Sequence, residues 1–115
     1  MPDKRTKGRE GELEAARVLA KKGYKILATN FRSPFGEIDI IAEEDGFLVF
    51  IEVKRRTNAS FGSSFEAVDS RKMLHIIRSA KMYLKMNRCI GRRVRFDVVG
   101  IDGDTVKVIK HAFTE

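Results

Sequence analysis

The chain of 115 residues contains one cysteine, two prolines and no tryptophan. With Cys89 alone, an intrachain disulfide and a zinc cluster built from several cysteines are both excluded. No segment approaches the roughly 18 consecutive apolar residues that a membrane helix needs. Residues 1–7 are charged but precede no apolar stretch, so they do not resemble a secretory signal. We therefore expect a cytoplasmic protein that makes no contact with a membrane.

Acidic residues are the scarcer charge. Lys and Arg number 23 against 16 Asp and Glu, which gives a formal charge of +7 and a pI near 9.8. Such a balance favours a polyanionic partner, with nucleic acid ahead of a membrane surface. Surplus lysines also keep many small proteins in solution, so charge alone leaves both interpretations open. The hydrophobic fraction of 43% and the length fit one folded domain.

Five segments are predicted to form strands. Asp45-Gly46 and Asp102-Gly103 each lie between two apolar runs and predict a hairpin turn. A helix is predicted over residues 8–22, ended by Gly23. Its apolar face would be Leu13, Ala16, Leu19 and Ala20. The predicted strands are 24–31, 37–43, 47–54, 94–101 and 105–109.

A second helix is predicted from a capping box at residues 63–66 to about Asn87, with a break permitted near Asp69. The order is then helix, three strands, helix and two strands, which predicts an α/β fold with a mixed sheet. The apolar stripe of this helix would be Met73, Ile76, Ile77, Ala80 and Leu84.

The third predicted strand carries charges where apolar residues are expected. Side chains alternate between the two faces of a strand, so Glu52 and Lys54 continue the face that begins with Leu48 and Phe50. Both faces are apolar at the start of this strand, which is typical of a central strand covered on both sides. Glu52 and Lys54 are therefore expected to be partly buried.

The turn signal also predicts a register. If Asp45 and Gly46 form a two-residue turn, Asp39 lies directly opposite Glu52. Directly opposed residues have Cβ atoms about 4.5–5.5 Å apart, and like charges in such a pair are destabilising. Two partly buried carboxylates in this position should share a proton or bind a cation.

Carboxylate oxygens at that spacing suit a hard divalent ion, Mg²⁺ above all. Lys54 would lie beside the ion, where it could orient a water or neutralise charge that develops on a phosphate. The alternative is an ordinary charge cluster on the sheet, with Glu37 and Lys54 as a cross-strand ion pair. Glu12, on the edge of the first helix's apolar face, could complete the acidic cluster or could be an acid stabilised by the helix dipole.

The motifs GREGE (8–12), GEIDIIA (36–42) and LVFIEVKRR (48–56) resemble those of the YraN family of small bacterial proteins. SFG (60–62), Lys72 and RFDVV (95–99) fit the same family. This family is similar to the PD-(D/E)XK nuclease superfamily, in particular to archaeal Holliday-junction resolvases and tRNA-splicing endonuclease-like folds. The proline of the superfamily motif is absent here, because Ile38 precedes Asp39.

The resemblance implies a restriction-endonuclease-like αβββαβ core, with a central mixed five-stranded sheet flanked by helices. Residues 1–7 would be a flexible N-terminus and residues 8–115 a single nuclease-like domain. The resemblance further implies Mg²⁺ (or Mn²⁺) held by Asp39, Glu52 and the backbone carbonyl of Val53. Lys54 would take the place of the motif's lysine and Glu12 that of the resolvases' helix glutamate.

Nine basic and no acidic side chains occur between residues 70 and 96. A basic stripe on the second helix suits sequence-independent contact with phosphates, although a solvated helix face would look the same. Phe31, Phe35, Phe61 and Phe65 could stack on unpaired bases, with packing as the favoured interpretation. The candidate nucleic-acid contacts are Arg55, Arg56, Arg71, Lys72, Arg78, Lys81, Lys85, Arg92, Arg93 and Arg95.

The leading hypothesis is a Mg²⁺-dependent endonuclease that hydrolyses phosphodiester bonds in DNA, including branched or damaged DNA. Its expected catalytic residues are Glu12, Asp39, Glu52 and Lys54. One alternative is a non-catalytic nucleic-acid-binding accessory module that keeps the nuclease fold, and another is a scaffold for an acidic protein. DNA is expected ahead of RNA. Because resolvase-like folds usually dimerise to cut two strands, a homodimer also stays open.

Overall fold

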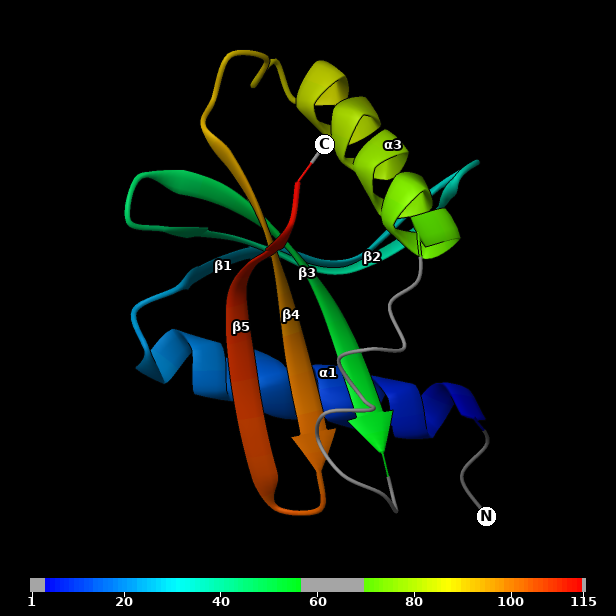
Figure 1. Cartoon of the computed structure of the whole chain (residues 1–115), viewed down its shortest axis with the longest axis vertical. Coiled ribbons are helices and arrows are strands. Elements are labelled where there is room, and N and C mark those ends of the chain that lie inside the picture. The colour runs from blue at the N-terminus through cyan, green and yellow to red at the C-terminus, as the bar shows by residue number, and fades with distance from the viewer. Residues whose placement is uncertain (1–3, 57–69, 115) are drawn as a thin grey trace.

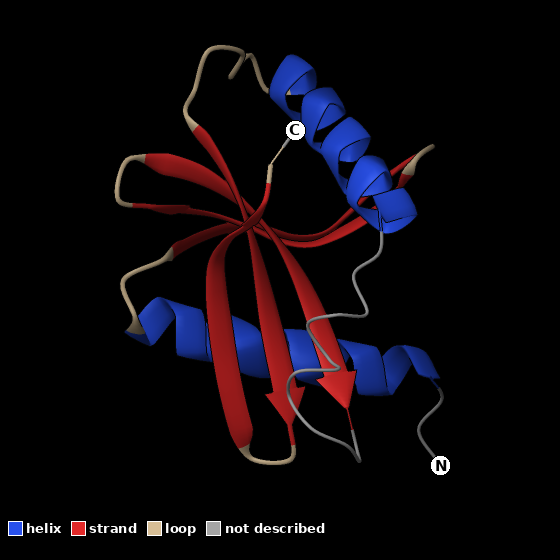
Figure 2. Ribbon diagram, viewed as in Figure 1, coloured by secondary structure: helices blue, strands red, loops and turns tan. Residues whose placement is uncertain are grey.

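A five-stranded sheet lies between two helices in the structure, a computed structural model that describes residues 4–56 and 70–114 (Figures 1 and 2). The predicted α/β class with a mixed sheet is confirmed. No helix in the described segments is long and apolar enough to cross a membrane. In chain order the elements are α1 (Lys4–Lys21), β1 (Lys25–Ser33), β2 (Gly36–Glu44), β3 (Phe47–Arg56), α3 (Ser70–Met86), β4 (Val94–Asp102) and β5 (Thr105–Phe113).

The sheet order follows the chain, β1-β2-β3-β4-β5. β3 and β4 are parallel, and every other neighbouring pair is antiparallel. A parallel pair needs a long crossover connection, and α3 lies in that connection. β3 is thereby central, as its apolar residues on both faces predicted.

The turn between β2 and β3 has the predicted form. Asp45 and Gly46 both have positive φ, 54° and 80°, as a two-residue hairpin turn of the I′ type requires. The resulting register pairs Ile40 with Ile51, in agreement with the sequence. In the other hairpin Asp102 pairs with Thr105, so its turn lies one residue later than predicted.

α1 presents a different face to the sheet from the predicted one. Gly11, Ala15 and Leu19 are buried, whereas Leu13 is 57% exposed and Ala20 is exposed. The prediction is wrong for Leu13 and Ala20, because the helix turns Gly11, Ala15 and Leu19, spaced four residues apart, toward the sheet. The small residues at Gly11 and Ala15, four apart on one face, let the helix backbone lie close to the sheet. α1 also begins at Lys4 rather than at the expected residue 8.

α3 packs as its periodicity predicts. Ile76, Ile77 and Ala80 are buried against the opposite face of the sheet, and Met73 and Leu84 are half-buried. The capping box at residues 63–66 lies outside the described residues. Two apolar layers result, one on each face of the sheet. The layer beneath α1 includes Ile40, Val49, Ile51, Val99 and Ile101, and the layer beneath α3 includes Ile38, Ile41, Leu48, Phe50 and Phe96.

The β1–β2 hairpin bends at Asn30. This residue has φ 55° although it lies inside β1. Ala28 and Phe31 both pack on the α3 side of the sheet, whereas strict alternation would place residues three apart on opposite faces. The bend therefore exchanges the two faces of the hairpin.

β2 bends together with β1. Ile38 and Ile41 both lie on the α3 side, while Ile40 packs toward α1. Strict alternation along an unbent strand would place Ile38 on the same face as Ile40, and the bend is the reason that it does not. The pairing of β2 with β3 ends at Ile40 and Ile51. Beyond that pair the hairpin tip turns toward α3, while β3 continues across α1 (Figure 1).

Arg95 is buried, in contrast to its expected place on a nucleic-acid-binding surface. It is 3% exposed and lies in an ionic network on the α1 side of the sheet. Its Nε donates to Asp97 Oδ1 at 2.9 Å, and its Nη1 lies 2.7 Å from Glu44 Oε1. The Tyr24 hydroxyl donates to Asp97 Oδ2 at 2.7 Å. These partners hold the guanidinium inside the fold, so it cannot reach a phosphate.

We expect the substitution Arg95→Met to lower the free energy of unfolding by about 3–5 kcal/mol, because it leaves the buried Asp97 carboxylate without its cation. Urea unfolding at pH 7, followed by circular dichroism, measures the change. The matched control is Arg93→Met, whose guanidinium lies 4.4 Å above the Phe47 ring and whose loss should cost less than about 1 kcal/mol. Equal losses in the two variants would contradict this role for the network.

Candidate metal centre

Asp39 lies at the point where β2 and β3 part. Its Oδ2 accepts a hydrogen bond of 2.8 Å from the backbone N–H of Val53. The carboxylate thus accepts from a β3 donor two residues beyond Ile51, the last β3 residue that pairs with β2. The N–H and C=O of one strand residue point to the same side. The Val53 carbonyl therefore faces the space beside Asp39, as a further metal ligand would.

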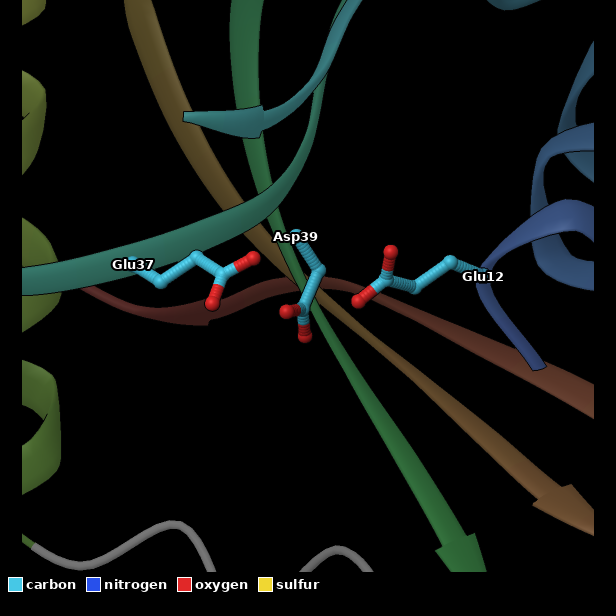
Figure 3. Close-up of side chains that lie close together, drawn as sticks. All are labelled: Glu12, Glu37 and Asp39. Atoms are coloured by element: carbon cyan, nitrogen blue, oxygen red, sulfur yellow. The ribbon is translucent and has the colours of Figure 1, made fainter. Parts of the chain in front are cut away.

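Three carboxylates converge at this place (Figure 3). Glu12 reaches in from α1, and Glu37 and Asp39 come from β2. Each offers an oxygen that lies within 4.8 Å of the others. Glu12 and Asp39 are half-buried, and Glu37 is exposed. Glu12 thus leans toward the sheet and joins an acidic cluster, but with Glu37 and Asp39 rather than with Asp39 and Glu52.

Glu37 enters this cluster in a different role from the one expected. The alternative drawn from the sequence made it an ion-pair partner of Lys54 across an unbroken ladder. The β2–β3 ladder ends before Glu37, and its side chain points toward Asp39 instead (Figure 3). The bend of the hairpin, which the alternation pattern does not encode, is the physical reason.

Burial and mutual repulsion shift the protonation of these acids. Burial, followed by the charge of Glu52, raises the pKa of Asp39 to about 8, and the hydrogen bond from Val53 opposes the shift only in part. Burial likewise raises the pKa of Glu12, against a hydrogen bond from the Asn30 side chain. Acids with raised pKa values in one cluster hold protons until a cation replaces them.

The residues fit a hard divalent cation. Glu12 Oε2 is buried and has no hydrogen-bond partner in the described part of the protein. A buried carboxylate oxygen without a partner is costly, and a cation would satisfy it. Mg²⁺ binds through a few carboxylates and keeps several waters, and this mixture of buried and exposed oxygens permits that arrangement.

Glu52 lies next to this cluster but outside it. Its side chain is 5% exposed, and its Oε1 lies 2.7 Å from Lys72 Nζ and 4.0 Å from Lys54 Nζ. The sequence placed Glu52 opposite Asp39 as a joint metal ligand. In the structure Glu52 lies close enough for its charge to raise the pKa of Asp39, but the Glu52 carboxylate forms an ion pair with Lys72.

Two lysines flank the acids with different electrostatics. Burial and then the neighbouring Lys72 lower the pKa of Lys54. Burial opposes protonation of Lys72 as well, but its ion pair with Glu52 raises the pKa of Lys72 overall. Lys72 was expected only as a phosphate contact. The family resemblance included it, but charge pattern and spacing gave no signal for a role beside Glu52.

Asn30 is a site residue that sequence reasoning missed. Its positive φ marks the bend, and its side chain hydrogen bonds to Glu12. Asn is among the few residues other than Gly that adopt this backbone conformation readily. An Asn inside a predicted strand was the available signal.

The candidate nucleic-acid contacts fall into separate groups. Arg55 lies on β3 next to the centre, where its Nη2 is 3.4 Å from Glu14 Oε2. Arg92 pairs with Glu43 at 3.0 Å, and together with Arg93 it precedes β4, at the end of the sheet remote from Lys54. The Arg56 side chain lies outside the described residues. The candidate contacts that are exposed along α3 are Arg71, Arg78, Lys81 and Lys85.

The phenylalanines that could stack on bases differ in their surroundings. Phe31 packs edge-to-face on Tyr83, with ring centroids 5.3 Å apart, so packing is its role. Phe35 is 40% exposed at the tip of the β1–β2 hairpin. Phe61 and Phe65 lie outside the described residues.

Comparison with known proteins places this chain among small bacterial relatives. The family described as uncharacterised protein family UPF0102 matches residues 11–101. UPF0102 proteins of Persephonella marina and Moorella thermoacetica are 44% and 46% identical to the chain, covering 93% and 96% of it and 92% and 97% of their own lengths. One of Lachnoclostridium phytofermentans is 46% identical over 96% of the chain and 95% of its own length. YraN is the E. coli member of this family, so the expected family resemblance is confirmed.

Without divalent cations, we expect stability to fall as pH rises from about 4 to about 8. The pKa of Asp39 is raised from 3.8 to about 8 in the fold, so the native state binds a proton that the unfolded chain releases. Asp39→Asn removes this dependence. Near pH 8.5 the free energy of unfolding of the variant should be at least about 1 kcal/mol higher than that of the wild type, because one pKa unit corresponds to about 1.4 kcal/mol. The advantage should vanish near pH 4.

Urea unfolding in EDTA at both pH values measures that difference. Asp104→Asn makes the same chemical change in an exposed turn and keeps Asp39, so its stability should fall with pH as that of the wild type does. A stability difference between Asp39→Asn and wild type that is constant with pH would contradict the buried, proton-holding carboxyl.

Removal of one cluster oxygen should weaken cation binding. We expect Glu12→Gln and Glu37→Gln each to lower the affinity for Mg²⁺ by about tenfold or more, because each carboxylate supplies one of few ligands. Calorimetric titration with Mg²⁺ and Mn²⁺ at pH 8 measures it. Glu10→Gln, an exposed position on the same helix, is the control and should bind as the wild type does. Equal weakening in Glu10→Gln would point to a general charge effect.

Proposed function

This chain belongs to the uncharacterised protein family UPF0102, and we propose that it is a divalent-cation-dependent nuclease that hydrolyses phosphodiester bonds in DNA. The observation that carries the proposal is the convergence of Glu12, Glu37 and Asp39, with a buried Glu12 oxygen that has no partner in the described structure. Lysines beside a carboxylate cluster in a basic chain are the further support.

The finer assignment to the PD-(D/E)XK nuclease superfamily belongs to the same proposal. The described order αβββαββ contains the αβββαβ core that the resemblance implies. Asp39 lies at the fork of β2 and β3, and Glu52 and Lys54 follow on β3 just beyond the last backbone pair. A motif of this superfamily would place its acids and its lysine in that order.

Asp39, Glu12 and Glu37 would hold the cation, with the Val53 carbonyl directed at the same space. Once bound, Mg²⁺ or Mn²⁺ would neutralise phosphate charge and acidify a water. Glu52 is a further candidate ligand beside Asp39. Its ion pair with Lys72, 2.7 Å long, would have to break before it could contribute.

Lys54 would act on the reacting groups. Its pKa is lowered, so it exchanges a proton more readily than an exposed lysine. It would position the attacking water and offset the charge that grows on the phosphate as the bond to the leaving oxygen breaks. Lys72, held by Glu52, would keep that carboxylate oriented.

The second candidate function is a nucleic-acid-binding module without cleavage. One observation favours it: the Lys72 ammonium already compensates the buried Glu52 carboxylate. A lysine in that place can take the structural role of a metal ion by neutralising the buried carboxylate. Such a module would bind DNA through its basic surface and would need neither Mg²⁺ nor Asp39.

We expect the wild type with Mg²⁺ to cleave at least one of single-stranded, duplex, flap and four-way DNA, and EDTA to stop it. Asp39→Asn should slow cleavage by about 100-fold or more, since it weakens cation binding and the electrostatic support of the transition state. The assay follows end-labelled substrates on denaturing gels. Asp104→Asn is the control and should cleave normally.

Equal traces from wild type and Asp39→Asn on every substrate would rule out the nuclease. Binding that is unaffected by EDTA and by Asp39→Asn, with no product on any substrate, would instead support the non-catalytic module.

A further inference from the structure

A groove of about 350 Å³ lies between the β1–β2 turn and α3, apart from the acidic cluster. Its volume is within the range of ligand pockets, roughly 300–1,000 Å³. One wall is the exposed Phe35 ring. Phe35 belongs to the β1–β2 turn, and the tip of this hairpin lies beside α3 (Figure 1). The groove is lined by Phe35, Arg78, Lys81, Met82 and Lys85.

The lining combines an aromatic ring with one sign of charge. Three of its five residues are basic and none is acidic. Arg78, Lys81 and Lys85 follow one another at helical spacing, so their side chains project from one face of α3. A ligand that suits this lining must offer a flat apolar surface together with negative charge.

Hydrogen bonds fix the turn that carries Phe35. Ser33 Oγ lies 2.7 Å from Ser79 Oγ, a buried hydroxyl of α3. The Phe35 backbone N–H donates to the same Ser33 Oγ at 3.0 Å. The turn is therefore attached to the helix, and the backbone that carries the Phe35 ring is held in place before any ligand arrives. Such preorganisation lowers the entropic cost of binding.

We propose that this groove binds an unpaired nucleotide of a single-stranded nucleic-acid segment, with the base stacked on Phe35 and the neighbouring phosphates on Arg78 and Lys85. The inference rests on the proposed function and deepens it, because it specifies a substrate with a single-stranded region. Every base has a face that stacks on an aromatic ring, and a base is free to do so only where it is unpaired.

The helix links the groove to the acidic cluster. Lys72, which contacts Glu52, precedes Arg78 by six residues and Lys85 by thirteen, or about 9 and 20 Å along α3 at 1.5 Å per residue. A stacked strand rises about 3.4 Å per nucleotide along its axis, so it covers this distance in roughly three to six nucleotides. A nucleotide bound in the groove would thus determine which phosphate of the nucleic acid reaches the acidic cluster, a few nucleotides away from the unpaired base.

The test compares a 12-nucleotide oligo(dT) with an abasic oligonucleotide of equal length and charge, by fluorescence anisotropy in EDTA so that no cleavage occurs. Phe35→Leu should weaken oligo(dT) binding roughly 5- to 150-fold, the loss expected for one stacked base, and leave abasic binding unchanged. The matched control is Leu27→Ala on β1, since Leu27 is 40% exposed like Phe35. It should change neither affinity.

A double variant, Arg78→Gln with Lys85→Gln, separates the charge from the ring. It should weaken both oligonucleotides alike and reduce the slope of log affinity against log salt by about 1.4, the value for two phosphate contacts on a single strand. Phe35→Trp guards against a folding defect. It introduces the sole tryptophan of the chain, whose emission should change with oligo(dT) and not with the abasic strand.

The outcomes separate this inference from the nuclease proposal. Base-dependent loss in Phe35→Leu without cleavage by the wild type would leave the groove standing and overturn the nuclease. Cleavage by the wild type together with equal binding of oligo(dT) by wild type and Phe35→Leu would overturn the groove alone. Equal loss on both oligonucleotides, or no binding of oligo(dT) by the wild type, would also overturn the groove.

Discussion

Where β2 leaves β3, a backbone N–H of the central strand would remain without a partner inside the protein, and the Asp39 carboxylate accepts it at 2.8 Å. An unsatisfied buried amide costs about as much as a lost hydrogen bond, so the two strands can part at this point only because an acceptor is supplied. The same contact fixes the carboxylate beside Glu12 and Glu37. The divergence of the strands and the acidic cluster therefore depend on one hydrogen bond.

A second buried aspartate has the same backbone role with the opposite electrostatic result. Asp97 Oδ1 accepts the His111 N–H at 3.2 Å, at the irregularity of the β4–β5 ladder. Arg95 and Tyr24 then complete its hydrogen bonds, so its charge is balanced within the fold. Asp39 has acidic neighbours instead, and burial among them raises its pKa. Neighbours, rather than the aspartate itself, decide whether a buried carboxylate is paired with an arginine or has its pKa raised by burial and nearby acids.

Local signals predicted much of this arrangement. The Asp45-Gly46 turn determined the β2–β3 register, and apolar residues on both faces identified β3 as central. What the sequence could not provide depends on contacts between distant segments. The positive φ of Asn30 bends the hairpin and brings Glu37 to Asp39, and no alternation pattern reports it. The partner of Glu52 comes from a helix beyond a crossover connection, so spacing along the chain does not reveal it.

The parallel pairing of β3 with β4 has a consequence for the order of folding. Leu48 pairs with Val94 across a long stretch of chain, whereas the β1–β2, β2–β3 and β4–β5 pairs are closed by turns of two residues. Closing the longer loop costs more conformational entropy, so the β3–β4 contacts are expected to form later in folding. The N-terminal helix and three strands can thus bring the carboxylates together before α3 delivers Lys72. For that interval Lys54, which is on β3, already lies beside the carboxylates, and docking of the crossover helix adds Lys72 as the closer partner of Glu52.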